Sequence, residues 1–127
     1  MDDDAKLATA LEMIQAWNDI DIDKVIEMFA EDGQMHLMME AEPTRGRPAL
    51  RKRVGKLCDA ASEINIEIRN AGVVNGSVFL ERVDNFVIGG HHGAMPVVGV
   101  LEIEDGLVRM WREYYDHATL RSGLGLS

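Results

Sequence analysis

Hydrophobic positions in the first half of the chain recur every three or four residues, which is the spacing of a helix that buries one face. This spacing predicts an amphipathic helix over about residues 4–18 and a short second helix that begins after Asp21 and ends at Gly33. A third predicted helix, over residues 48–61, opens on a proline, which suits a first helical turn. The short apolar run 34–39 between the second and third helices predicts a strand.

In the second half of the chain, hydrophobic and polar residues alternate one by one, which is the period of a half-buried strand. The dipeptides Asn75-Gly76 and Asp105-Gly106 are typical of two-residue hairpin turns, and residues 89–93 predict a looser connection. Early helices and late antiparallel strands predict an α+β fold, with three helices packed on one face of a curved sheet of about five strands. The predicted strands are 34–39, a run beginning near Ile64, 78–88, 95–104 and 107–117.

The length of 127 residues and the hydrophobic content of 46% suit one domain that spans residues 1–127 and buries its core without disulfides or structural metal. The single cysteine, Cys58, lies in a helical pattern and is interpreted as a small core residue. Residues 118–127 carry little periodicity and are interpreted as a tail that either docks on the domain or stays free.

The net charge of −9 argues against a nucleic-acid partner, because neutralising phosphates requires clustered basic residues. The basic residues between 45 and 56 spread around a predicted helix and are interpreted as a solvated face. No apolar stretch is long enough to cross a membrane, and the acidic N-terminus is unlike a secretory signal. We therefore expect a cytoplasmic protein with no membrane partner.

A charged pair interrupts the apolar run 78–88. Arg82 and Asp84 share one face of the predicted strand with hydrophobic residues, and buried charges are costly unless they are paired. The two-residue spacing brings the guanidinium to the neighbouring carboxylate, and a second acid from another strand completes the pairing. Asp116 is the candidate for that second acid. If Asp116 points inward, alternation turns Tyr114 inward as well.

These residues resemble the limonene-1,2-epoxide hydrolase family. The resemblance rests on the element order, on Arg82-x-Asp84, on the strand Pro96-Val97-Val98-Gly99 and on the segment Trp111-Arg112-Glu113-Tyr114-Tyr115-Asp116, and it covers roughly residues 5–117. It implies a cone-shaped α+β fold of the superfamily that also holds ketosteroid isomerases and polyketide cyclases. It also implies a homodimer.

The resemblance implies a one-step hydration of an epoxide without a metal, cofactor or covalent intermediate. Asp116 matches the family's general base, Asp84 its general acid and Arg82 the arginine between them. Two carboxylates with opposite tasks must differ in protonation at one pH, and a shared arginine in an apolar setting drives their proton affinities apart. The resemblance also places His36 and Met38 at the positions of the family's water-holding tyrosine and asparagine.

The resemblance implies a small apolar substrate, such as a terpenoid or cyclic epoxide. The residues that we expect to contact it are Met38, Phe86, Met95 and Tyr114. The adjacent histidines His91 and His92 point apart in an extended segment, so no metal site is predicted.

Three alternatives stay open. A proton-transfer enzyme of the isomerase or cyclase type would use one aspartate beside a carbonyl group. A non-catalytic protein would use the apolar interior to hold a hydrophobic ligand. The third is a structural ion-pair network or a charged strand edge, the ordinary role of charged residues in a strand.

Overall fold

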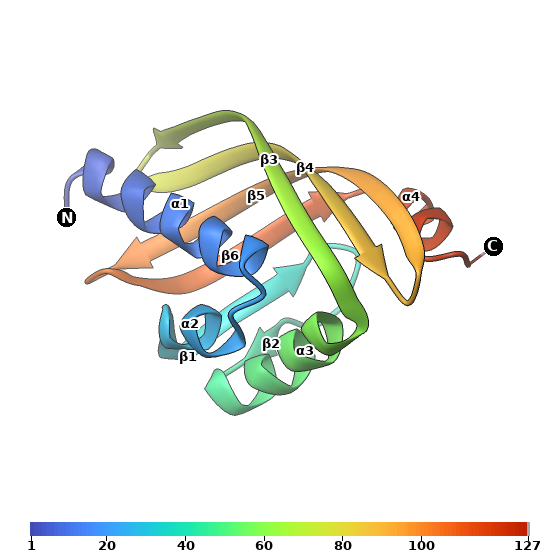
Figure 1. Ribbon diagram of the computed structural model, residues 1–127. Coiled ribbons are helices and arrows are strands. Elements are labelled where there is room, and N and C mark those ends of the chain that lie inside the picture. Colours follow the sequence, from blue (N-terminus) through green and yellow to red (C-terminus); the bar gives the residue numbers. More distant parts are fainter. Residues whose placement is uncertain (127) are drawn as a thin grey trace.

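The computed structural model describes residues 1–126, which form a six-stranded sheet with four helices against it (Figure 1). The sheet order is β2-β1-β6-β5-β4-β3, and all neighbours are antiparallel except the parallel pair β1 and β6. The elements in chain order are α1 (Asp3–Asn18), α2 (Ile22–Glu27), β1 (Phe29–Leu37), β2 (Thr44–Arg45), α3 (Arg47–Ala60), β3 (Ala61–Val74), β4 (Ser77–Ile88), β5 (His91–Glu104), β6 (Leu107–Tyr115) and α4 (His117–Gly123).

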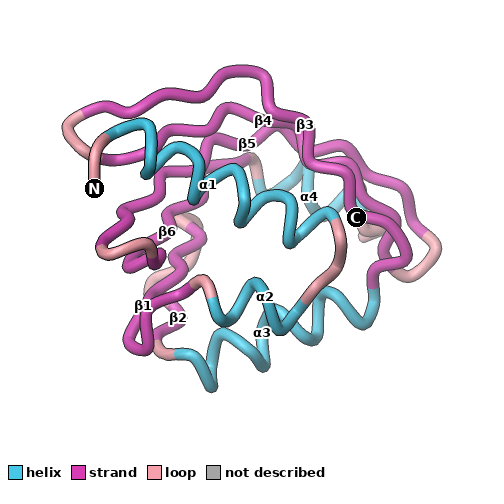
Figure 2. Tube along the Cα trace, turned by 60° about the vertical axis from the view of Figure 1, so that its left-hand side comes forward, coloured by secondary structure: helices cyan, strands magenta, loops and turns pink. Residues whose placement is uncertain are grey.

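The helices α1, α2 and α3 lie on one side of a strongly curved sheet, and α4 lies at the far end of β5 and β6 (Figures 1 and 2). This arrangement confirms the α+β class, the mostly antiparallel curved sheet and the three helices on one face. The sheet has one strand more than expected, because the two-residue strand β2 pairs with β1.

Local signals explain where the N-terminal helices begin. Asp2 caps α1 by accepting a hydrogen bond of 2.8 Å from the Ala5 N–H, and Asp21 caps α2 by accepting one of 3.1 Å from the Lys24 N–H. Pro48 lies in the first turn of α3, as expected from its fixed φ angle.

The prediction that Gly33 ends the second helix is wrong. Helix α2 ends at Glu27, and Gly33 lies inside β1, where the pairing with β6 shifts register. A Cβ atom on Gly33 would lie 2.9 Å from the Ala30 oxygen and 3.0 Å from the Val108 oxygen, so this close approach needs glycine.

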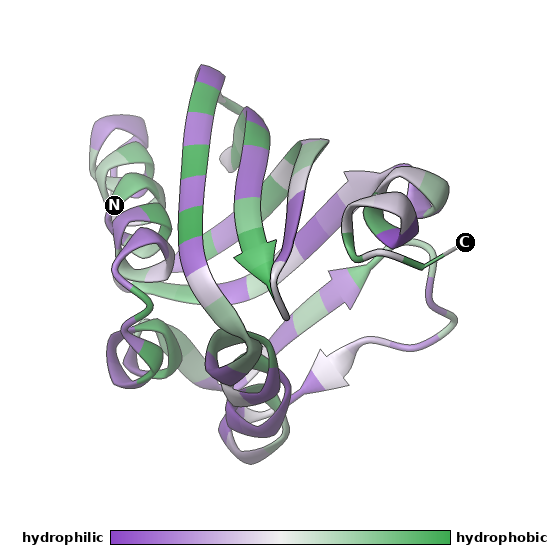
Figure 3. Cartoon of the chain, turned by 45° about the vertical axis from the view of Figure 1, so that its right-hand side comes forward, coloured by the Kyte–Doolittle hydropathy of each residue, from purple (hydrophilic) through white to green (hydrophobic). Residues whose placement is uncertain are grey.

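Both hairpin predictions are confirmed. Asn75 and Gly76 have φ angles of 50° and 78°, and Asp105 and Gly106 have φ angles of 53° and 79°, which is the positive-φ pair of a type I′ turn. The resulting strands alternate between polar and apolar residues (Figure 3). The apolar face of the sheet packs on α1 to α3 and forms the main core, which includes Met13, Trp17 and the buried Cys58.

The predicted tail partly forms a helix, α4, and Ser127 lies outside the described residues. Leu120 and Leu124 are one helical turn apart and pack on a second apolar cluster formed by Phe86, Met95 and Val97. The tail therefore docks on the domain.

Candidate functional site

Arg82 lies at the centre of a buried charge cluster. Its side chain, 3% exposed, makes a two-pronged contact with Asp84, in which Nε donates to Oδ1 over 2.8 Å and Nη2 donates to Oδ2 over 3.0 Å. On the opposite side, Nη1 donates to Glu113 Oε1 over 2.8 Å, and Nη2 also donates to Glu113 Oε2. The expected arginine between two carboxylates is present, and the second carboxylate is Glu113.

Strand register brings these side chains together. Arg82 on β4 lies opposite Val97 on β5, and Glu113 on β6 lies opposite Gly99. Val97 and Gly99 are two residues apart, so they share a face of β5, and the charged side chains meet above it. A Cβ atom on Gly99 would lie 2.5 Å from Arg82 Nη1 and 2.7 Å from Glu113 Oε1, so glycine leaves the space in which the ion pair forms.

Trp111 supports Glu113 from the same strand. Its indole N–H donates to Glu113 Oε1, and its ring lies 5.7 Å from the Arg82 guanidinium carbon. Phe29 stacks on the indole with the ring centroids 6.2 Å apart, and Trp17 meets it edge-on at 6.3 Å. This aromatic packing holds the donor in place and shields one side of Glu113, whose side chain is only 7% exposed, from bulk solvent.

Burial and charge act in opposite directions on this cluster. Burial raises the pKa of Glu113, while the Arg82 charge and the hydrogen bonds from Arg82 and Trp111 oppose the shift. Burial alone would lower the pKa of Arg82, but the charge of Glu113 and the contacts with Asp84 outweigh it, so the guanidinium stays charged. The two carboxylates therefore share one permanent cation.

The prediction that Asp116 is the second acid on Arg82 is wrong. Asp116 follows the end of β6, is exposed, and caps α4 by accepting hydrogen bonds of 3.2 Å from the Thr119 N–H and 2.7 Å from its hydroxyl. The hydrogen bond from the Thr119 hydroxyl is the main cause of its lowered pKa. The reason is alternation, because the inward-facing Trp111 and Glu113 place the even-numbered residues that follow Trp111 on the outer face.

The same alternation corrects three further positions. Tyr114 is 45% exposed on the outer face of β6, and Met38 lies beyond the end of β1 and is 37% exposed. His36 pairs with Arg112 in register, and its Nε2 lies 2.9 Å from the Glu40 carbonyl oxygen. The residues of β1 in register with Trp111 and Glu113 are Met35 and Leu37, which therefore face the cluster.

Phe86 and Met95 lie on the same face as Asp84, as expected. Both are buried in the second apolar cluster, which Leu120 of α4 and Leu124 directly after this helix cover. Asp84 lies two residues before Phe86 and opposite Met95, and its side chain is 18% exposed. An apolar wall therefore adjoins the more accessible of the two carboxylates.

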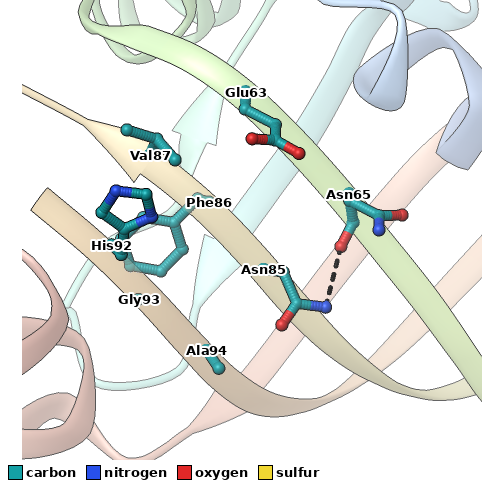
Figure 4. A pocket seen from close by; sticks show the side chains of 8 residues that line it. All are labelled: Glu63, Asn65, Asn85, Phe86, Val87, His92, Gly93 and Ala94. Atoms are coloured by element: carbon teal, nitrogen blue, oxygen red, sulfur yellow. Dashed lines mark hydrogen bonds between the residues drawn. The ribbon is translucent and has the colours of Figure 1, made fainter. Parts of the chain in front are cut away.

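Two surface pockets lie away from Arg82. The pocket in Figure 4 is lined mainly from the other face of the sheet and also includes Phe86. On that face Asn85 Nδ2 donates to the backbone oxygen of Asn65 over 3.2 Å. The second pocket lies between β5 and α4 and includes Asp116. Within residues 1–126, no group of three or more His, Cys, Asp or Glu side chains is placed to hold a metal ion.

Sequence reasoning missed Glu113, although the signal was in the motif. A tryptophan is the bulkiest side chain of this strand, and an inward Trp111 makes the residue two places later inward as well. That residue is Glu113.

Comparison with known proteins places these features in a family. Residues 5–125 match the model of the limonene-1,2-epoxide hydrolase catalytic domain. The curated epoxide hydrolase EphG of Mycobacterium tuberculosis is 34% identical over 59 residues, which are 46% of this chain and 40% of that protein.

Two solved structures share the fold. An M. tuberculosis LEH-like epoxide hydrolase has a TM-score of 0.84 at 22% identity, with 96% of this chain and 90% of that chain covered. The epoxide hydrolase/cyclase-like enzyme SalBIII, associated with pyran ring formation in salinomycin, has a TM-score of 0.79 at 18% identity, with 88% and 91% covered. In the part of this chain that the structure describes, no helix is long and apolar enough to span a membrane.

Proposed function

Because the chain belongs to the limonene-1,2-epoxide hydrolase family, we propose that it opens a small apolar epoxide by adding water, with Glu113 and Asp84 as the base and acid. One observation carries this proposal, namely that the buried guanidinium of Arg82 is hydrogen bonded to both carboxylates at once. The catalytic cluster that we propose is Asp84, Arg82 and Glu113, in place of the cluster with Asp116.

The step balances with protons alone. Glu113 takes a proton from a water molecule while the water oxygen forms a bond to an epoxide carbon. The bond from that carbon to the epoxide oxygen breaks, and the oxygen takes a proton from Asp84 as its negative charge develops. The product is a diol, and proton exchange with solvent returns the two carboxyl groups to their starting states.

The surroundings of Glu113 support its role as the base. Three N–H groups from Arg82 and Trp111 donate to its oxygens, which stabilises the carboxylate form. Burial meanwhile raises its pKa, which makes it a stronger base than an exposed glutamate. One guanidinium balances only one carboxylate, and in the proposed step Asp84 holds the proton that it gives to the epoxide oxygen.

The apolar wall beside Asp84 supports a hydrocarbon substrate. Phe86, Met95 and Leu120 offer no charged group, so they favour the carbon skeleton of the substrate rather than polar substituents. The homodimer and the cytoplasmic location stay predictions, and size-exclusion chromatography with light scattering tests the first.

A second candidate function is ring closure, in which a hydroxyl group of the substrate itself attacks the epoxide. The observation that favours it is the pair Met35 and Leu37, which face the cluster from β1 and offer no strong hydrogen bond to hold a free water. The solved structure of SalBIII, described as hydrolase/cyclase-like and linked to pyran ring formation, is consistent with this chemistry in the same fold.

Turnover in water enriched in oxygen-18 tests both candidates. We expect a simple cyclic epoxide to give a diol that carries one labelled oxygen, and a hydroxy-epoxide that gives an unlabelled cyclic ether instead would identify ring closure. Asp116→Asn serves as the control, because the exposed Asp116 is not part of the cluster. If neither substrate class reacts with the parent protein, the enzymatic proposal fails and ligand binding becomes the better account.

A further inference from the structure

The indole N–H of Trp17 is a buried donor to which no group in residues 1–126 offers an acceptor. Trp17 is 7% exposed, and it lies at the end of α1 in the main core. Buried polar groups in native proteins are nearly always hydrogen bonded, so each exception calls for a partner that the chain itself does not supply.

The Trp17 indole packs on an aromatic residue of the charge cluster, and the next residue in the chain is tied to the sheet. Its ring meets Trp111, the donor to Glu113, edge-on with the centroids 6.3 Å apart. The next residue, Asn18, accepts a hydrogen bond of 2.7 Å from the N–H of Ile66, and Ile66 lies directly opposite Asp84 in the sheet. The Trp17 ring therefore packs on the residue that donates to Glu113, and the residue after Trp17 is tied to the strand position opposite Asp84.

The other side chains near Glu113 offer few free hydrogen-bond donors to a bound oxygen atom. The N–H of Trp111 is already used on Glu113, and the neighbouring strand β1 presents Met35 and Leu37. Neither of these two side chains can donate a hydrogen bond. An oxygen atom bound beside Glu113 thus receives no hydrogen bond from the side chains of Met35 and Leu37 on β1. The Trp17 N–H, which has no acceptor within residues 1–126, remains available to donate one.

We propose that the Trp17 indole N–H donates a hydrogen bond to an oxygen atom bound in the site, supplied either by the reacting water or by the substrate. A water that accepts from Trp17 and donates to Glu113 keeps a lone pair free for attack on carbon. A substrate oxygen at the same place gains a hydrogen bond that the side chains of Met35 and Leu37 cannot supply. The chemical identity of this oxygen rests on the proposed function, but its binding does not.

Nuclear magnetic resonance tests the binding directly, because the chain has two tryptophans and gives two indole N–H signals. Trp17→Phe assigns the Trp17 signal. We expect a magnetisation transfer from water to this N–H in the free protein if the oxygen is water, and a shift of the signal on adding trans-cyclohexane-1,2-diol if the substrate supplies it. Methylcyclohexane, which has no oxygen, should leave the signal nearly unchanged.

Kinetics provide the second readout. We expect Trp17→Phe to lower kcat by tenfold or more, and its melting temperature to fall no further than that of Met13→Ala, because both changes remove buried side-chain atoms from the same core. The control Met13→Ala, one turn earlier on α1 and fully buried, should lower the melting temperature and leave kcat nearly intact. An unchanged kcat in Trp17→Phe, or an indole signal that responds to neither water nor diol, would overturn the proposal. Because the indole signal needs no turnover, a failure of the epoxide chemistry remains a separate result.

Discussion

Gly99→Ala should break the charge cluster without changing a charged residue. The new methyl group would lie 2.5 Å from Arg82 Nη1, 2.7 Å from Glu113 Oε1 and 3.1 Å from Trp111 Nε1, and real Cβ atoms essentially never come closer than 3.0 Å to such atoms. All three side chains are buried, so they cannot move away without losing the hydrogen bonds that pair their charges.

We expect Gly99→Ala to lower the free energy of unfolding by about 3 kcal/mol. This value lies at the upper end of the range for overpacking a core and at the lower end of the range for breaking a buried ion pair. The unfolding entropy is about 2.1 cal/mol/K per residue, or about 0.27 kcal/mol/K for 127 residues. The melting temperature should therefore fall by about 11 °C.

Thermal and urea unfolding followed by circular dichroism measure this change. The matched control is Gly72→Ala on β3, where a Cβ atom would meet nothing within 4 Å. Replacing this strand glycine should stabilise the protein by about 0.5–1 kcal/mol, because alanine loses less conformational freedom on folding. A Gly99→Ala variant as stable as the Gly72→Ala variant would refute the account of how β5 makes room for the cluster.

Two further predictions concern the proposed chemistry. Burial raises the pKa of Glu113, and Trp111→Phe removes a hydrogen bond that lowers it, so the acidic limb of the kcat/KM profile should move to higher pH in this variant. A limb that moves down or stays would contradict the role of Glu113 as base. Leu120→Ala shortens a side chain that packs with Phe86 in the apolar wall, so it should raise KM for an apolar epoxide about tenfold in a steady-state assay. The control Leu126→Ala, at an exposed position, should leave KM unchanged in the same assay.

The sequence predicted the parts of the fold that local signals determine. The dipeptides Asn75-Gly76 and Asp105-Gly106 require positive φ angles that few other residues accept, so both hairpins could be located. Gly33 was misinterpreted because a glycine that permits a close approach within a sheet is identical in sequence to one that ends a helix. Residues 118–127 carry too little periodicity to predict helix α4, although Leu120 and Leu124 have helical spacing.

The site was predicted in part for a related reason. Arg82 and Asp84 are two residues apart on one strand, so their pairing is local and could be inferred. The second carboxylate depends on how β6 lines up with β5, which alternation indicates only if one inward residue is known. With Asp116 as the inward residue, alternation wrongly turns Tyr114 inward and places the second carboxylate three residues too late in the chain. With Trp111 as the inward residue, alternation identifies Glu113 as the second carboxylate.

Turnover of an epoxide by Glu113→Gln, measured beside Asp116→Asn, tests the central claim most directly. Glutamine keeps the shape of the side chain but cannot take a proton from water, so we expect diol formation to fall by at least a hundredfold in Glu113→Gln. Asparagine caps a helix as well as aspartate does, so Asp116→Asn should retain nearly full activity. Retained activity in Glu113→Gln together with lost activity in Asp116→Asn would contradict the claim that Arg82 unites Asp84 with Glu113 as the reacting pair.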